Sequence, residues 1–266
     1  MKYITLSLCW LAVVVVAGGL WPASAAALEV DEIVERANLA AYYAGDDGRS
    51  EVEMTITDSQ GRERQRRLVI LRQDIEDGGR QLFYVYFERP ADVRRMVFMV
   101  HKYLDRDDDR WLYLPDLDLV RRIAAADKRS SFAGSHFVYE DVSGRTPADD
   151  HHQLAEEGED YYLLDITPKD PELVEFSRYT ARIDKATMLP VYMEYFDRNG
   201  DKYRVVEALE TEEIDGHPTV VRSRVRDLAS GGETVMEFSN VRYDIGLDES
   251  LFSERYLRRP PREVRR

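Results

Sequence analysis

The sequence contains a single cysteine among 266 residues, and that residue, Cys9, lies close to the N-terminus. Disulfide bonds, thiol nucleophiles and thiolate metal sites all require cysteine, so the rest of the chain contains none of these features. Its stability must come from the burial of side chains in a core. About 240 residues follow the N-terminal segment, which is enough for one large core.

Positive charge is also scarce. The chain has 37 Lys and Arg residues against 51 Asp and Glu residues, which gives a formal net charge of −14 at pH 7. Proteins that bind nucleic acids use a basic surface to contact phosphates, so we expect no nucleic-acid partner. The same deficit argues against an anionic membrane as a docking surface.

Long apolar runs are absent after the first 27 residues, and those residues have the parts of a secretory signal peptide. Lys2 is followed by the uncharged stretch Ile4–Leu20 and then by a run of small residues. We predict export, with cleavage after Ala25 or Ala27, where the A-x-A pattern fits a signal peptidase. An uncleaved anchor is the alternative, since the apolar stretch is close to the roughly 20 residues that span a bilayer. Pro22 and the alanines favour cleavage.

Lipidation of the N-terminus is not expected. Cys9 stands at the start of the apolar stretch rather than at its end, and Leu8 is bulky where a lipoprotein cleavage site needs a small residue. The mature chain, residues 28–266, is therefore predicted to be a single domain in the periplasm.

The mature chain begins with one predicted helix, Glu32 to Tyr43, with Asp31 as its cap, and then changes to a period of two. We predict about 11 to 13 strands joined by short turns such as Asp197–Gly200. Consecutive strands joined this way are antiparallel. The chain shows no strand–helix alternation and no glycine-rich phosphate loop, so the predicted fold class is mainly β with few helices.

Several predicted strands are apolar on both faces, as in residues 82–87, where Leu82, Tyr84 and Tyr86 alternate with Phe83, Val85 and Phe87. Something must therefore cover each face of the sheet. A closed sandwich of two sheets is the simpler interpretation of this pattern. The alternative is one strongly curved sheet whose hollow is capped by helices and leaves space for an apolar ligand.

The segment 125–142 follows neither a strand nor a turn pattern. It is too long for a hairpin loop, and loops of this length in compact domains are typically functional lids or disordered. Phe132, Phe137 and Tyr139 argue against disorder. We predict a lid, called the lid below, whose aromatic side chains rest on the mouth of the sheet.

Three stretches in and before the lid carry a family resemblance. Trp111-Leu-Tyr-Leu-Pro115, Val120-Arg-Arg-Ile123 and Ser131-Phe-Ala-Gly-Ser-His-Phe-Val-Tyr-Glu-Asp141 resemble the signature of the LolA-like outer membrane lipoprotein-sorting proteins. Phe87-Glu-Arg-Pro90 and the helix directly after the signal peptide are similar as well.

The resemblance implies a large curved antiparallel sheet that forms an incomplete barrel capped by helices. It also implies a periplasmic carrier that binds acyl chains of lipoproteins or lipids, acts as a monomer, and exchanges cargo with an inner-membrane transporter, often of the resistance-nodulation-division type, and an outer-membrane acceptor. The residues expected to line the hollow or its lid are Phe83, Val85, Phe98, Trp111, Phe132, Phe137 and Tyr139.

Two other functions remain open from the sequence. One is an interaction module with a filled core that partners an envelope transporter without carrying cargo. The other is a secreted hydrolase, for which Ser135, His136 and Asp141 are the nearest approach to a triad, although triad members are usually remote in sequence. We expect a protein that is not an enzyme.

No cofactor or metal is expected either. His151 and His152 are adjacent, and neighbouring side chains on a strand point to opposite faces, so they would not chelate one ion. Arg222, Arg224 and Arg226 fall on one strand face, where pairing with acidic neighbours is expected. The basic tail 255–266 is predicted to be a frayed end.

Overall fold

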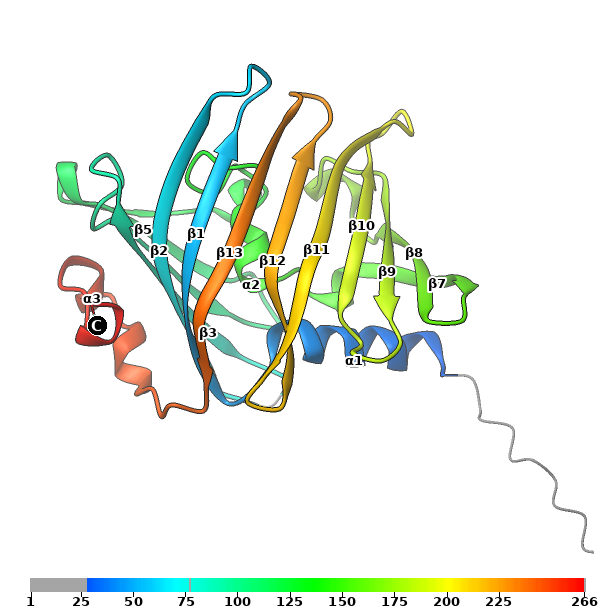
Figure 1. Cartoon of the computed structure of the whole chain (residues 1–266), viewed down its shortest axis with the longest axis horizontal. Helices are drawn as coiled ribbons and strands as arrows, with labels where there is room; N and C mark the ends of the chain where they lie inside the picture. The colour runs from blue at the N-terminus through cyan, green and yellow to red at the C-terminus, as the bar shows by residue number, and fades with distance from the viewer. Residues whose placement is uncertain (1–27, 77, 266) are drawn as a thin grey trace, which may run out of the picture.

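The computed structural model describes residues 28–76 and 78–265, so the predicted signal peptide lies outside the described part of the chain. These residues form one antiparallel sheet of 13 strands with few helices (Figure 1), which confirms the predicted fold class. The sheet is not closed, because β6 and β7 stand at its two ends. A single curved sheet also rules out the sandwich of two sheets.

The strands of this sheet follow one another with short connections, apart from the one between β6 and β7. Their bounds are β1 Asp47–Thr57, β2 Glu63–Asp74, β3 Gln81–Arg89, β4 Val97–Lys102, β5 Asp109–Leu114, β6 Leu119–Arg122, β7 Asp150–Glu157, β8 Tyr161–Pro168, β9 Arg178–Asp184, β10 Pro190–Phe196, β11 Lys202–Ile214, β12 His217–Asp227 and β13 Gly232–Tyr243. The helices are α1 Val30–Tyr42, α2 Tyr139–Ser143 and α3 Arg255–Arg258, with 3₁₀ turns η1 Pro115–Leu117, η2 Ala125–Asp127, η3 Pro147–Asp149, η4 Pro171–Leu173, η5 Glu249–Phe252 and η6 Arg262–Val264.

Two meanders make up the sheet. Strands β1 to β6 form one and β7 to β13 the other, and they join where β1 pairs with β13, with Val52 opposite Phe238. The end of β6 and the start of β7 therefore lie at opposite edges of the sheet. Residues 123–149 connect the two edges and contain the predicted lid. The connection must be long because it crosses from one edge of the sheet to the other, whether or not it also acts as a lid.

The concave face of the first meander carries an apolar cluster that the lid completes. Alternate residues of β1, namely Val52, Met54 and Ile56, are almost fully buried in it. Phe132 and Phe137 of the lid pack into the same cluster. The alternation in β1 thus sends apolar side chains inward, as the period of two predicted.

The convex face of the same meander is also apolar, and the C-terminal segment, residues 244–265, covers it. Leu82 and Tyr84 of β3 lie on this face, where they cluster with Leu257 and Val264, both of which have no exposed area. The Tyr84 hydroxyl donates a hydrogen bond of 2.7 Å to the carbonyl of Tyr256. The prediction of a frayed tail at residues 255–266 was therefore wrong for its described part, because the sheet supplies an apolar surface for it.

Helix α1 covers the concave face of the second meander (Figure 1). Its Ile33 is fully buried among side chains of β8 and β9 together with Phe176. The helix begins at Val30 after Glu29, and no side chain caps its N-terminus, so the predicted cap at Asp31 was wrong. Packing of the apolar face positions the helix without a cap.

The convex face of the second meander is polar. Arg222 pairs with Glu237 at 3.2 Å, and Arg224 and Arg226 both pair with Glu207, at 2.8 and 3.3 Å. The predicted pairing of the arginine ladder with acidic neighbours is confirmed. Among the described residues, no helix is both long enough and apolar enough to span a bilayer.

Candidate functional site

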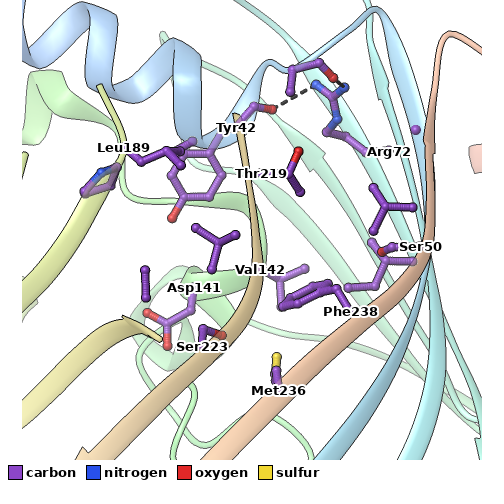
Figure 2. Close-up of a pocket in the computed structure, with 18 of the residues that line it drawn as sticks. Tyr42, Ser50, Arg72, Asp141, Val142, Leu189, Thr219, Ser223, Met236 and Phe238 are labelled. Carbon is purple, nitrogen blue, oxygen red and sulfur yellow. Dashed lines mark hydrogen bonds between the residues drawn. The ribbon is translucent and has the colours of Figure 1, made fainter. Parts of the chain in front are cut away.

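A cavity of about 330 Å³ lies on the concave side of the sheet, beneath the end of α1 and beside the lid (Figure 2). Its wall comes from both meanders and is predominantly apolar. Its apolar lining includes Leu68, Ile70, Phe83, Phe132, Phe137, Val142, Met193, Val206, Met236 and Phe238. This volume and lining are typical of a site for a small apolar ligand.

The aromatic side chains of the lid reach the cavity because a tight turn folds them inward. Ala133 and Gly134 have positive φ values of 51° and 73°, and the Ser135 hydroxyl donates to the carbonyl of Phe132 at 2.7 Å. Phe132 and Phe137 consequently point the same way and line the cavity. A glycine suits the second position of this turn, since L-residues rarely adopt that φ.

Three of the seven predicted lining residues, Phe83, Phe132 and Phe137, line the cavity. Three more belong to or pack against the same apolar cluster, namely Val85 and Phe98 of the sheet beneath the lid and Tyr139 of the lid itself. Of these, Phe98 lies 4.9 Å from Tyr139 between ring centres and 5.6 Å from Phe132. Val85 is fully buried in the same layer.

Trp111 is separated from the other six. It pairs with Met99 across β4 and β5, and both side chains lie on the convex face under the C-terminal segment. Its ring lies 4.9 Å from that of His101. Trp111 therefore does not line the cavity. Because β5 is apolar on both faces, its sequence gave no signal for which face turns inward.

One wall of the cavity is polar. Tyr42 from the end of α1 and Asp141 from α2 line the same side of the cavity, and Ser223 of β12 lies close to Asp141 (Figure 2). Burial raises the pKa of the Tyr42 hydroxyl above its usual range, and the nearby charge of Asp141 adds to this. Tyr42 is therefore a neutral hydrogen-bonding group at physiological pH.

Arg72 fixes the end of α1 above the cavity. Its guanidinium donates to the backbone carbonyls of Tyr42, Ala44 and Gly45 and pairs with Asp74 at 2.8 Å. Carbonyls at the C-terminus of a helix have no partners within the helix, and a cation there also complements the helix dipole. The arrangement holds Tyr42 over the hollow.

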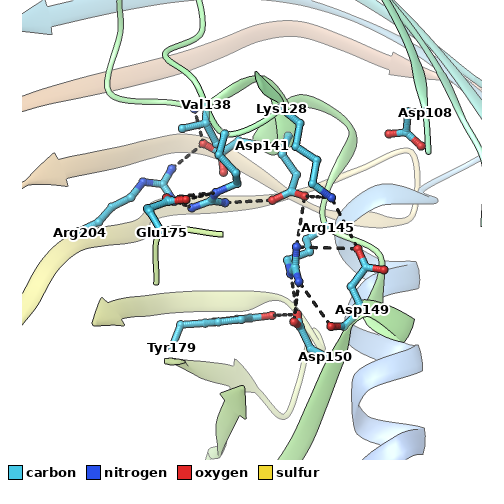
Figure 3. A network of polar contacts seen from close by, with 12 residues as sticks. Asp108, Lys128, Val138, Asp141, Arg145, Asp149, Asp150, Glu175, Tyr179 and Arg204 are labelled. Carbon is cyan, nitrogen blue, oxygen red and sulfur yellow. Dashed lines mark hydrogen bonds and ion pairs between the residues drawn. The ribbon is translucent and has the colours of Figure 1, made fainter. Parts of the chain in front are cut away.

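A network of buried charges fixes α2 and the lid (Figure 3). Glu140, which is 2% exposed, contacts Lys128 and Arg129 at 3.0 Å each and Arg145 at 3.4 Å. Burial alone would raise the pKa of Glu140, but the charges of Arg129, Lys128 and Arg145 outweigh it and lower the pKa to about 2. Glu140 therefore stays ionised when the protein is folded.

The same network ties the lid to the second meander. Arg129 pairs with Glu175 at 2.7 Å, and Arg145 pairs with Asp150 at 2.8 Å. The Tyr179 hydroxyl donates to Asp150 at 2.9 Å. On the side of the first meander, Lys102 donates to the carbonyl of Ser143, the last residue of α2, at 2.7 Å. The lid is thus attached to both halves of the sheet.

The three residues considered for a triad do not form a relay. The Ser135 hydroxyl donates to the Phe132 carbonyl, whereas the His136 Nδ1 atom lies 2.8 Å from the hydroxyl of Thr234. Asp141 pairs with Arg204 at 2.5 Å. Each of these groups instead stabilises the lid or its contact with the sheet.

Sequence reasoning missed Tyr42, Asp141, Met236 and Phe238 as lining residues. Met236 and Phe238 alternate with Glu237 in β13, so the period of two pointed them to one face. Asp141 stands inside the signature segment that carried the family resemblance. For Tyr42 no local signal exists, because its position depends on how α1 packs on the sheet.

Comparison with known proteins agrees with this architecture. A family model described as “Uncharacterized protein” matches residues 79–259. A DUF1329 family protein from Desulfovibrio piger is 31% identical, with 85% of this chain and 96% of that chain covered and a TM-score of 0.78. No curated protein matches.

Two further solved structures share the fold. A domain from Vibrio parahaemolyticus, described as an outer membrane lipoprotein-sorting protein, is 26% identical over 86% of this chain and 98% of that chain, with a TM-score of 0.78. A LolA superfamily protein from Nitrosomonas europaea is 20% identical over 86% of this chain and all of that chain, with a TM-score of 0.67. The identity to the first of these proteins places the chain in the DUF1329 family, and the open curved sheet with helices in its hollow is the fold that it shares with the lipoprotein-sorting domain and the LolA superfamily protein.

Proposed function

We propose that the protein is a periplasmic carrier that shields an acyl chain of a lipoprotein or lipid in the cavity beneath α1 and the lid. The observation that carries the proposal is the cavity of about 330 Å³ with a mainly apolar lining. Apolar surface left facing an empty space in a core is unfavourable, whereas a ligand that fills the space gains contacts with the wall.

The volume supports a chain of moderate length. A methylene group is similar in size to water, which occupies about 30 Å³ in the liquid, so the cavity accommodates about 10 methylene groups. Burial of that many groups contributes about 8 kcal/mol before the cost of association, at about 0.8 kcal/mol for each group. A gain of this size is enough to keep a single chain out of water.

One neighbour is described as an outer membrane lipoprotein-sorting protein, which supports a binding role. A carrier of this kind would receive its cargo from an inner-membrane transporter and pass it to an acceptor in the outer membrane. The N-terminal segment with its signal-peptide pattern supports the periplasm as the place of action.

A binding experiment tests the proposal. The mature protein is purified and extracted with organic solvent for mass spectrometry, and its affinity for the apolar dye N-phenyl-1-naphthylamine is measured by fluorescence. We expect a co-purified acyl lipid and dye binding in the micromolar range. Phe137→Asp should abolish both, because it places a charge in the apolar wall.

Leu173→Asp is the matched control, since Leu173 is 63% exposed and lies outside the cavity. Circular dichroism shows whether each variant is folded. Absence of both lipid and dye binding in the folded wild-type protein would refute the carrier. Dye binding that survives Phe137→Asp would place the binding site elsewhere.

A further inference from the structure

The polar wall of the cavity restricts the kind of head group that the cavity accepts. Leu68, Phe83 and Met236 provide apolar surface elsewhere in the lining, but the side of Tyr42 and Asp141 offers polar atoms (Figure 2). A chain bound here meets these atoms in a partly buried setting, in which the side chain of Asp141 is 21% exposed. Polar groups in such a setting are strongly selective, because a mismatched partner leaves a buried group unsatisfied.

The two arginines that line the cavity already have acceptors. Arg72 binds three carbonyls at the end of α1 and the carboxylate of Asp74. Arg49 lines the cavity, but its guanidinium bonds to Glu51 and to the carbonyl of Glu263. An anionic ligand would have to compete with these acceptors for a guanidinium.

Asp141 lies between the cavity and a third arginine, Arg204. Arg204 is 4% exposed, and its Nη2 atom pairs with Asp141 at 2.5 Å, while its Nε and Nη1 atoms have no hydrogen-bond partner among the described residues. Of this pair, only Asp141 lines the cavity. The guanidinium of Arg204 also lies 5.1 Å from the ring centre of Tyr195, which occupies one of its faces. A ligand in the cavity therefore meets the carboxylate of this pair rather than the guanidinium.

Tyr42 completes the wall as a neutral group. Within the described part of the chain, no residue forms a hydrogen bond with its hydroxyl, and its raised pKa keeps the proton in place. The hydroxyl can donate to a carbonyl or accept from an amide, and Asp141 can accept from an amide or a hydroxyl. A ligand carboxylate beside Asp141 would instead place two negative charges next to the single guanidinium of Arg204.

We propose that the cavity selects a single acyl chain whose polar group is uncharged, such as an amide, an ester or an alcohol, and discriminates against the carboxylate of a free fatty acid, with Asp141 and Tyr42 as the determining residues. This inference rests on the proposed carrier function. It assigns the ligand to acylated molecules in which the chain is linked through a neutral bond, and it separates them from free fatty acids.

Displacement of N-phenyl-1-naphthylamine from the mature protein by decanamide, decanol and decanoate tests the inference. The measurements are made at about pH 8, where decanoate is ionised, and below the critical micelle concentration. We expect decanamide and decanol to displace the dye at concentrations at least about tenfold lower than decanoate, which corresponds to about 1.4 kcal/mol. Because a charged compound leaves water less readily, decanoate would bind more weakly than the neutral compounds even without Asp141. The comparison of decanoate binding between the wild-type protein and the variants is therefore the decisive one.

Asp141→Asn removes the charge and keeps the shape. It should tighten decanoate about tenfold and change decanol less than about threefold. Tyr42→Phe keeps the ring and should weaken decanamide about fivefold, because it removes the hydroxyl as a hydrogen-bond partner. Glu172→Gln, whose side chain is 80% exposed and lies outside the cavity, is the control and should alter neither ratio.

The outcomes separate the two proposals. If neither the dye nor any of the three compounds binds, the carrier function itself fails. If all bind but Asp141→Asn leaves decanoate unchanged, the inference about Asp141 is wrong while the carrier stands. Urea unfolding of each variant shows whether it is folded. If Asp141→Asn is unstable, Tyr42→Phe still tests the inference. Unchanged decanamide binding in Tyr42→Phe would overturn it.

Discussion

The buried charge network makes a quantitative prediction for Glu140→Gln. Glutamine keeps the size of the side chain but removes the charge that compensates Lys128, Arg129 and Arg145. The pKa of Glu140 falls from 4.5 to about 2 on folding, and this shift corresponds to about 3 kcal/mol at 1.36 kcal/mol for each unit. Removing one partner from a buried network costs a similar amount, about 3–5 kcal/mol. We therefore expect the free energy of unfolding to drop by about 3 kcal/mol at pH 7.

The pH dependence gives the prediction its sharpest form. The folded pKa of Glu140 lies below its unfolded value, so its contribution is complete above pH 4.5 and is lost as the pH falls toward 2. Glutamine resembles the protonated acid at every pH. The difference between the wild-type protein and Glu140→Gln should accordingly shrink between pH 4.5 and 2. Urea unfolding followed by tryptophan fluorescence at several pH values measures it.

Glu172→Gln is the matched control. Its side chain is 80% exposed and lies 3.7 Å from Arg198, and a surface pair of this kind contributes at most about 1 kcal/mol. A loss below about 1 kcal/mol for Glu140→Gln at pH 7 would refute the argument that the network stabilises the lid. So would a loss of about 3 kcal/mol that stays constant down to pH 2.

The remaining predictions concern the ends and the packing of the lid. Leu257→Ala should cost about 2–5 kcal/mol in urea unfolding, because Leu257 is fully buried under the convex face; a cost below about 1 kcal/mol would mean that the C-terminal segment does not contribute to the core. Gly144→Ala should lower the melting temperature more than Gly200→Ala, since both glycines have positive φ but only a Cβ at Gly144 would lie 2.5 Å from the Tyr42 ring; equal shifts would contradict this. Burial lowers the pKa of Lys102 to about 8, so the unfolded chain binds more protons than the folded chain above that pH. The free energy of unfolding should therefore rise from pH 8 toward 10, and Lys102→Met should remove this rise. An unchanged slope in Lys102→Met would contradict the lowered pKa of Lys102.

The strands were predictable because their alternation is a local signal. Leu82 and Tyr84 were expected on one face of β3 and Phe83 and Val85 on the other, and the structure confirms both sets. The direction of each face was not predictable, because both are apolar. Trp111 was placed in the hollow for this reason, although it lies on the convex face.

The cover of the convex face and the charge network escaped prediction for a different reason. Leu257 and Val264 stand among arginines, so the local composition is that of a solvated tail. Their burial depends on an apolar surface formed by residues more than a hundred positions earlier. Likewise, Glu140 is one acidic residue among many, and only the fold brings Arg129 and Arg145 to it.

The pairing of β1 with β13 has a consequence for how the chain reaches its final shape. Val52 and Phe238 are neighbours across this pair although most of the chain separates them. Contacts between such distant residues form slowly, since the loop that they close is long. Until residue 243 is available, β1 and β12 each present an open edge, and exposed edges recruit other chains. The pairing of the two meanders therefore forms only once β13 is available, and until then the open edges of β1 and β12 expose the chain to aggregation.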